Sequence, residues 1–162
     1  MMDRRRFIAA ALAQGFVLAP LAAALSACGS KGDWPEGMAE FKWDRDTCVR
    51  CSMVISDRRF AAQIRGGEQA HAFKFDDIGC LVFWLRDKAE VHPWMATPAT
   101  RMWVADTTGK PNKSAHWLDP RSALFLAGRI SPMGYNFAAV AAPQDGSIDF
   151  AALRVQLLAR GR

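Results

Sequence analysis

The sequence predicts an α+β fold, because strand patterns and helix patterns mix within each half of the chain. Residues 71–75 alternate between apolar and polar side chains, as a half-buried strand does. Apolar residues at positions 78, 81, 82 and 85 then fall on one face of a helix. Asp76 and Asp77 stand where a carboxylate can cap that helix, which we expect to end near Ala89.

The other predicted strands are short apolar segments that end at Gly, Pro or Asp turns. Including the strand above, they cover 54–57, 60–64, 71–75, 101–105, 115–118, 122–127 and 134–141, of which 122–127 fits a helical turn equally well. Gly66-Gly67 favours a β-hairpin between the second and third of them. A last helix is predicted after a Ser147 cap, with Phe150, Leu153, Leu157 and Leu158 on its buried side.

The first 27 residues have the layout of an export signal: three arginines, then an apolar stretch, then small residues. Leu25-Ser26-Ala27-Cys28 resembles a lipobox, which would make Cys28 the lipid-modified first residue of the mature protein. Arg4-Arg5-Arg6-Phe7-Ile8 also resembles the twin-arginine pattern of exported folded proteins. An uncleaved membrane helix over 7–27 is the alternative. Both interpretations place residues 28–162 outside the cytoplasm at a membrane surface.

The net charge of the chain is +5, and the three arginines and one aspartate of the signal supply +2 of it. Residues 28–162 therefore carry only +3, which is ordinary for solubility. No block of Lys and Arg follows the signal. The charge pattern removes the case for a nucleic-acid binder.

The segment Cys48-Val49-Arg50-Cys51-Ser52-Met53 places two thiols and a thioether within six residues. Soft sulfur ligands favour Cu(I) over metals that prefer oxygen. If Cys51 and Met53 begin a strand, their side chains project from the same face and can reach one ion. With Cys28 lipidated, three cysteines remain, and an odd number leaves at least one thiol without an intrachain disulfide partner.

Four alternatives for this segment stay open. Cys48 and Cys51 could form a disulfide, since the spacing and the compartment both allow it. They could join Cys80 and a histidine in a structural zinc site. They could serve a thiol–disulfide oxidoreductase, although that chemistry opens a helix with its first cysteine, whereas a strand pattern follows here. Met53 could be an ordinary core methionine.

Four motifs follow one another along the chain. They are Asp46-x-Cys48-x-x-Cys51-x-Met53, Asp57-Arg58-Arg59-Phe60-Ala61-Ala62-Gln63, Phe75-Asp76-Asp77-Ile78-Gly79-Cys80 and Ser131-Pro132-Met133-Gly134. In this order they resemble the NosL-type lipoproteins, which are accessory copper chaperones of nitrous oxide reductase maturation. The resemblance extends from about Trp43 to Val140, and the lipoprotein start also fits it.

The resemblance implies two small ββαβ-like units packed together, the first over 43–110 and the second over 111–162. A signal peptide (1–27) and a flexible tether (28–42) would precede them. It also implies a periplasmic, lipid-anchored Cu(I) carrier without enzymatic activity, which acts in denitrification as a monomer. Its partners would be the copper-accepting maturation machinery or the apo-reductase.

By position, Cys51 and Met53 match the ligand-bearing Cys-x-Met of the family, and Met133 matches the methionine of its Pro-Met-Gly segment. Cys48 is a further candidate ligand or a disulfide partner. The turn around Met133 favours an exposed tip over a packed core. Ser52 departs from the glycine that is usual between the two ligands. A serine there is strained if the loop requires a positive φ.

Overall fold

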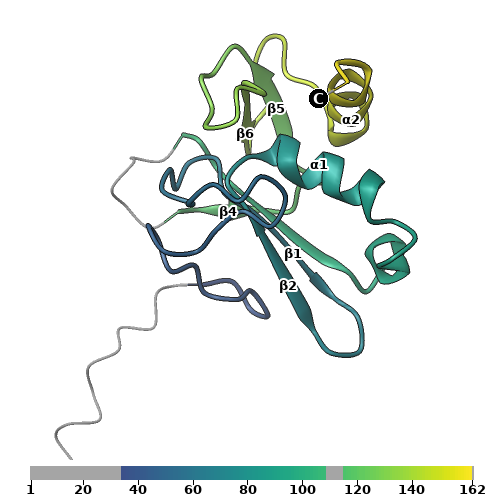
Figure 1. Ribbon diagram of the computed structural model, residues 1–162. Coiled ribbons are helices and arrows are strands. Elements are labelled where there is room, and N and C mark those ends of the chain that lie inside the picture. The colour runs from purple at the N-terminus through teal and green to yellow at the C-terminus, as the bar shows by residue number, and fades with distance from the viewer. Residues whose placement is uncertain (1–33, 109–114, 162) are drawn as a thin grey trace, which may run out of the picture. The chain divides into compact units, whose positions relative to one another are not determined.

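The computed structural model describes residues 34–108 and 115–161 (Figure 1). The predicted signal peptide, the lipobox with Cys28, the alternative membrane helix over 7–27 and the start of the tether lie outside the described residues. Within the described ranges, no helix combines the length and the apolar character that crossing a bilayer requires.

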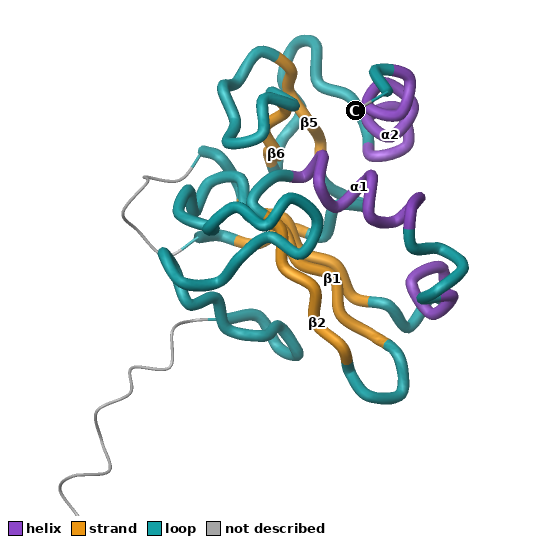
Figure 2. Tube along the Cα trace, viewed as in Figure 1, coloured by secondary structure: helices purple, strands orange, loops and turns teal. Residues whose placement is uncertain are grey.

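Six strands and two α-helices form the described part, and the strands make two antiparallel sheets (Figure 2). The four-stranded sheet has the order β2-β1-β3-β4 and the second sheet pairs β5 with β6. The elements are β1 (Ala62–Gly66), β2 (His71–Phe75), α1 (Ile78–Asp87), the short 3₁₀ helix η2 (Pro93–Ala96), β3 (Arg101–Ala105), β4 (Trp117–Leu118), β5 (Leu124–Ala127), β6 (Phe137–Val140) and α2 (Phe150–Ala159). The predicted α+β class is confirmed.

The first half of the described chain follows the expected ββαβ order, with β1, β2, α1 and β3 in turn. The second half does not. Trp117–Leu118 pairs with the open edge of β3, so β4 extends the first sheet across the expected boundary at 110/111. Only the β5–β6 pair then remains in the second sheet, and α2 follows it as the last element.

The strands β2 and β3 have the predicted bounds, and the β1–β2 hairpin is confirmed, with Ala62 opposite Phe75 and Gly66 opposite His71. Gly67 lies in its turn with a φ of 75°, a conformation that glycine adopts without strain. The predicted strand at 54–57 is wrong. Val54 forms only an isolated bridge with Thr47, because the chain between them closes a tight loop.

The helix α1 is capped as predicted, since Asp77 accepts a hydrogen bond from the Gly79 amide. It packs against β1 and β2 on one side and against α2 on another, which explains why its first two turns are buried (Figure 1). The predicted cap of α2 is wrong: Asp149 accepts the bond from Ala152, while the Ser147 hydroxyl accepts one from Gln144 in the preceding turn.

The N-terminal segment 34–46 packs on the four-stranded sheet. The fully buried amide of Gln63 pairs with the backbone of Ala39 in both directions, at 2.8 Å each. Phe41 is buried and stacks on Trp117 of β4. Residues 34–42 were expected to belong to a flexible tether. They are packed, because this backbone pairing and aromatic burial attach them to the sheet.

Candidate metal centre

Residues 48–53 form a tight loop, here called the cysteine loop. The Cys48 amide donates to the Met53 carbonyl at 2.8 Å, and the Ser52 amide donates to the Cys48 carbonyl at 2.9 Å. Ser52 has a φ of 63°, in the left-handed region that costs a residue with a Cβ about 1–2 kcal/mol. The strain expected at this serine is confirmed. The backbone between Cys51 and Met53 is therefore not extended, so the condition under which both side chains would project from one face of a strand is not met.

The cysteine loop is attached to the end of β2. The Val49 amide donates to the carbonyl of Lys74 at 3.0 Å, and Lys74 pairs with Asp46 at 2.6 Å just before the loop. Asp76 follows β2 directly, so its carboxylate comes next to the loop. The Cys51 thiol lies 3.4 and 3.5 Å from the two carboxylate oxygens of Asp76.

Cys80 completes a group that we call the thiol cluster. In Cys48, Cys51, Asp76 and Cys80, the Sγ atoms and a carboxylate oxygen all lie within 4.8 Å of one another. Cys48 and Cys80 are buried and Cys51 is half-buried, and all three are free thiols. The structure therefore does not contain the alternative Cys48–Cys51 disulfide. The cluster approaches the surface at Cys51.

The three thiols have different proton affinities. The Cys80 thiol donates a hydrogen bond to Cys48, which lowers the pKa of Cys48 to about 7 against the opposing effect of burial. That donation is also the main reason why the pKa of Cys80 is raised. Burial raises the pKa of Cys51 to about 12. The thiol closest to solvent is therefore protonated at neutral pH.

The turn that carries Met133 lies against the start of α1. The Asp77 carboxylate accepts a bond of 2.5 Å from the Ser131 hydroxyl and one of 3.3 Å from the Met133 amide. Burial raises the pKa of Asp77 to about 6. Because Asp77 follows Asp76 in the chain, the Met133 turn and the thiol cluster meet at the same end of the helix.

A second connection runs through Tyr135. Its hydroxyl accepts a hydrogen bond of 2.8 Å from Arg50 of the cysteine loop. Its ring lies against Gly79, where an added Cβ would come within 2.2 Å of the ring carbons. Glycine is needed at this position because the phenol ring occupies the space of a side chain.

The predicted site residues differ in exposure. Met53 is 56% exposed, at the rim of the cysteine loop, so the alternative of a core methionine is wrong. Met133 is half-buried and packs against the core, so it is less exposed than its Pro-Met-Gly turn predicted. Cys51 and Cys48 lie together in the thiol cluster.

Sequence reasoning did not place Asp76 in this site and assigned Cys80 only to the zinc alternative. The signal in the sequence is the spacing of these two residues. Asp76 stands one residue before the helix cap, and Cys80 lies in the first turn of the helix, so both face the end of β2. The histidine of the zinc alternative is not present in the cluster. His71 and His92 lie around Phe73, and His116 pairs with Asp106.

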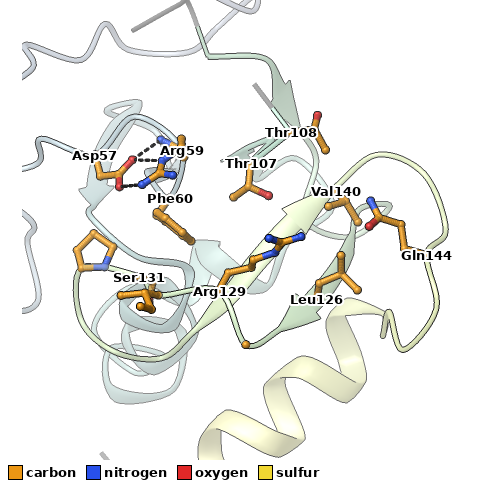
Figure 3. A pocket seen from close by; sticks show the side chains of 13 residues that line it. Asp57, Arg59, Phe60, Thr107, Thr108, Leu126, Arg129, Ser131, Val140 and Gln144 are labelled. Atoms are coloured by element: carbon orange, nitrogen blue, oxygen red, sulfur yellow. Dashed lines mark hydrogen bonds and ion pairs between the residues drawn. The ribbon is translucent and has the colours of Figure 1, made fainter. Parts of the chain in front are cut away.

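A pocket of about 710 Å³ opens beside the Met133 turn. Figure 3 shows Asp57 and Arg59 paired along one side and Arg129 extending across it. Ser131 and Pro132 also line the pocket, but no cysteine or methionine does. It lacks soft ligands, so the thiol cluster and the nearby methionines remain the candidate metal centre.

Comparison with known proteins agrees with this arrangement of motifs. Residues 42–152 match the profile of the NosL family. The fold is similar to the crystal structure of the copper chaperone NosL from Shewanella denitrificans, with a TM-score of 0.53 and 19% sequence identity over 75% of this chain and 89% of that chain. No curated protein matches the chain. Since the family profile covers more than half of its residues, the chain belongs to the NosL family.

Proposed function

We propose that the protein is a lipid-anchored periplasmic carrier of Cu(I) that delivers copper for the maturation of nitrous oxide reductase. The observation that carries the proposal is the convergence of sulfur-bearing segments at the start of α1, where Cys51 contacts Asp76 and the Met133 amide contacts Asp77. Family membership and the fold shared with a copper chaperone support it. As a NosL-family protein the chain is a chaperone and not an enzyme.

The proposed ligands are Cys51, Met53 and Met133, and the buried Cys48 is a further candidate. Thiolate and thioether sulfur form a soft donor set that suits Cu(I). Met53 is exposed and Cys51 is half-buried, which leaves one side of the ion open to an approaching acceptor. Two or three sulfur ligands leave a coordination position free.

Copper transfer then proceeds by ligand exchange. A sulfur of the acceptor enters the free position, and one sulfur of the carrier leaves, so the ion is never released to water. Binding of Cu(I) to Cys51 releases one proton to the solvent, because the pKa of about 12 keeps this thiol protonated until the ion displaces its proton. Met53 is the natural first ligand to leave, since its side chain is the most exposed of the set.

The location follows from the first part of the chain. The basic, apolar and small-residue segments of 1–27 act as the export signal, and Cys28 carries the lipid. Export of the folded domain by the twin-arginine route would keep the thiol cluster assembled during transport. Trp34 follows Cys28 by six positions in the sequence, so a lipid on Cys28 would keep the carrier close to the membrane.

Anaerobic titration with Cu(I) in competition with a chelator tests the proposal. We expect one ion to bind tightly to each chain, and the affinity to be lost when Cys51→Ser, Met53→Leu and Met133→Leu are combined. Met102→Leu is the matched control, because Met102 is buried in β3. Tight binding that survives the triple substitution would contradict the site.

Zinc is a second candidate ligand, favoured by the compact thiol cluster. Three thiolates and a carboxylate fit the tetrahedral donor set of a structural zinc site. Native mass spectrometry of protein purified without chelators separates the two ions by mass. Zinc retained by the wild type and lost in Cys80→Ser would assign the thiol cluster to zinc in place of copper.

The oxidoreductase alternative is less well supported. Cys48 is 1% exposed and cannot attack an external disulfide without opening of the loop. Its thiol is instead held by Cys80. The proposal therefore expects no reduction of insulin by the reduced protein beyond that of the Cys48→Ser variant.

A further inference from the structure

We propose that Asp77 is a positioning residue for copper: its carboxylate holds the Met133 turn against α1, so that Met133 and Cys51 can reach one ion. The proposal rests on the function proposed above, because it concerns how that site is assembled. Asp77 itself does not touch the metal.

The two oxygens of Asp77 serve different segments of the chain. Oδ1 accepts the bond from the Gly79 amide at 3.0 Å and so caps α1. Oδ2 accepts from the Ser131 hydroxyl and from the Met133 amide, whose residues are 54 and 56 positions away. The side chain is fully buried, so water cannot take its place in either role.

The Met133 turn is held together by hydrogen bonds of its own. The Ser131 amide donates to the Asn136 side chain at 3.2 Å, and the Asn136 amide donates to the Ser131 hydroxyl at 2.9 Å. The Gly134 amide donates to the Ser131 carbonyl at 3.0 Å. What Asp77 fixes is therefore the position of the whole turn, including the thioether of Met133.

The thiol side of the site is attached to Asp76, the residue before Asp77. Asp76 contacts the Cys51 thiol, and the Asp77 carbonyl accepts a bond from the Cys80 amide at 3.0 Å. Two consecutive acidic residues thus hold the thiol side and the thioether side. A metal site gains affinity when its ligands are held in place before the ion arrives, and loss of such a supporting residue typically costs 10–100-fold.

Capping and positioning can be separated by substitution. Serine caps helices about as well as aspartate, but its single oxygen cannot reach both Gly79 and the Met133 turn. Asp77→Ser therefore keeps the cap of α1 and releases the turn. Asp149→Ser is the matched control, since Asp149 caps α2 through Ala152 in the same manner.

The experiment measures Cu(I) affinity by chelator competition in the full chain for the wild type, Asp77→Ser, Met133→Leu and the double variant. We expect Asp77→Ser to weaken binding about 10–100-fold. It should add no further loss to Met133→Leu, because both remove the same ligand. X-ray absorption at the copper edge should show one sulfur fewer in Asp77→Ser, and Asp149→Ser should behave as the wild type.

The outcomes distinguish this proposal from the function on which it rests. If Met133→Leu weakens binding but Asp77→Ser does not, or if the two losses add, the role of Asp77 is overturned while the copper site stands. If Met133→Leu leaves the affinity unchanged, the ligand assignment itself fails, and the role of Asp77 fails with it. Should Asp77→Ser not fold, Ser131→Ala removes the hydroxyl bond with the helix cap intact and must show the same non-additive loss.

Discussion

The Arg50 guanidinium donates a hydrogen bond of 2.8 Å to the hydroxyl of Tyr135, across 85 residues of sequence. Arg50 also lies over the ring of Phe83 in α1, 4.6 Å from its centroid, and that ring is 5.6 Å from the ring of Tyr135. The cysteine loop, the helix and the Met133 turn therefore meet around one buried phenol. This contact and the Asp77 carboxylate are two separate connections between the same segments.

Gly79→Ala should destabilise the protein by about 1–3 kcal/mol, the usual cost of overpacking. Its Cβ would lie 2.2 Å from carbons of the Tyr135 ring, which is buried and cannot move aside freely. Urea unfolding measures the loss. In a Tyr135→Leu background the same substitution should cost clearly less, and an equal cost in both backgrounds would contradict the contact.

Ser52→Gly should stabilise the protein by about 0.5–1 kcal/mol, because relief of the left-handed strain exceeds the entropy that glycine adds to the unfolded chain. Ser56→Gly is the control: Ser56 is exposed and is not among the residues with positive φ. Ser56→Gly should lose about 0.4–1 kcal/mol, because glycine adds entropy to the unfolded chain. The midpoint temperatures of thermal unfolding of the two variants should therefore shift in opposite directions from the wild type. A shift in the same direction would argue against strain at Ser52.

Alkylation of the folded protein at neutral pH should be more than about tenfold slower than that of the unfolded chain, because thiolates and not thiols react. Burial holds the pKa of Cys51 near 12, so the accessible thiol is protonated. Cys48 has the lowered pKa of about 7 but is buried. Intact-mass analysis over time follows the reaction, and rapid single modification of the folded form would contradict this order.

The Asp57–Arg59 pair predicts a small loss of stability in acid. Burial alone would raise the pKa of Asp57, but the hydrogen bonds and charge of Arg59 lower it below the usual 3.8. A carboxyl whose pKa is lower in the folded state stabilises it above the unfolded pKa and loses that contribution as pH falls below about 4. The pair is partly exposed, so solvent screening limits the effect to about 0.5 kcal/mol.

Urea midpoints at pH 5.5 and pH 3 measure this contribution in the wild type and in Asp57→Asn. The wild type should lose more stability over that interval than the variant. Asp119→Asn serves as the comparison, since Asp119 pairs with Arg121 in the same way and is also partly exposed. If Asp57→Asn had the larger loss, the sign of the proposed pKa shift would be wrong.

Local patterns were sufficient for the elements that lie between clear turn signals. The strands at 71–75 and 101–105 have the predicted bounds for this reason. The start of α1 was also predicted, since its cap and its apolar spacing agree. The strand predicted at 60–64 begins two residues later, at Ala62, where pairing with Phe75 starts.

The thiol cluster could not be assembled from sequence, because it depends on how separate segments dock. The backbone bond from Val49 to Lys74 brings the cysteine loop to β2, and no local pattern encodes it. Gln63 is a further example: a polar residue in a strand predicts exposure, but its amide is buried against Ala39. The backbone of an irregular segment supplies the hydrogen-bond partners of this amide. Such segments have no periodicity from which the sequence could predict the contact.

The most direct test that one ion joins the two sulfur-bearing segments is NMR of the methionine methyl groups, with ¹³C label, during anaerobic addition of one equivalent of Cu(I). The methyl signals of Met53 and Met133 should shift together. The buried Met38, Met95 and Met102 act as internal controls and should not respond. Binding of Cu(I) with no change at Met133 would contradict the central claim that both sulfur-bearing segments hold one ion.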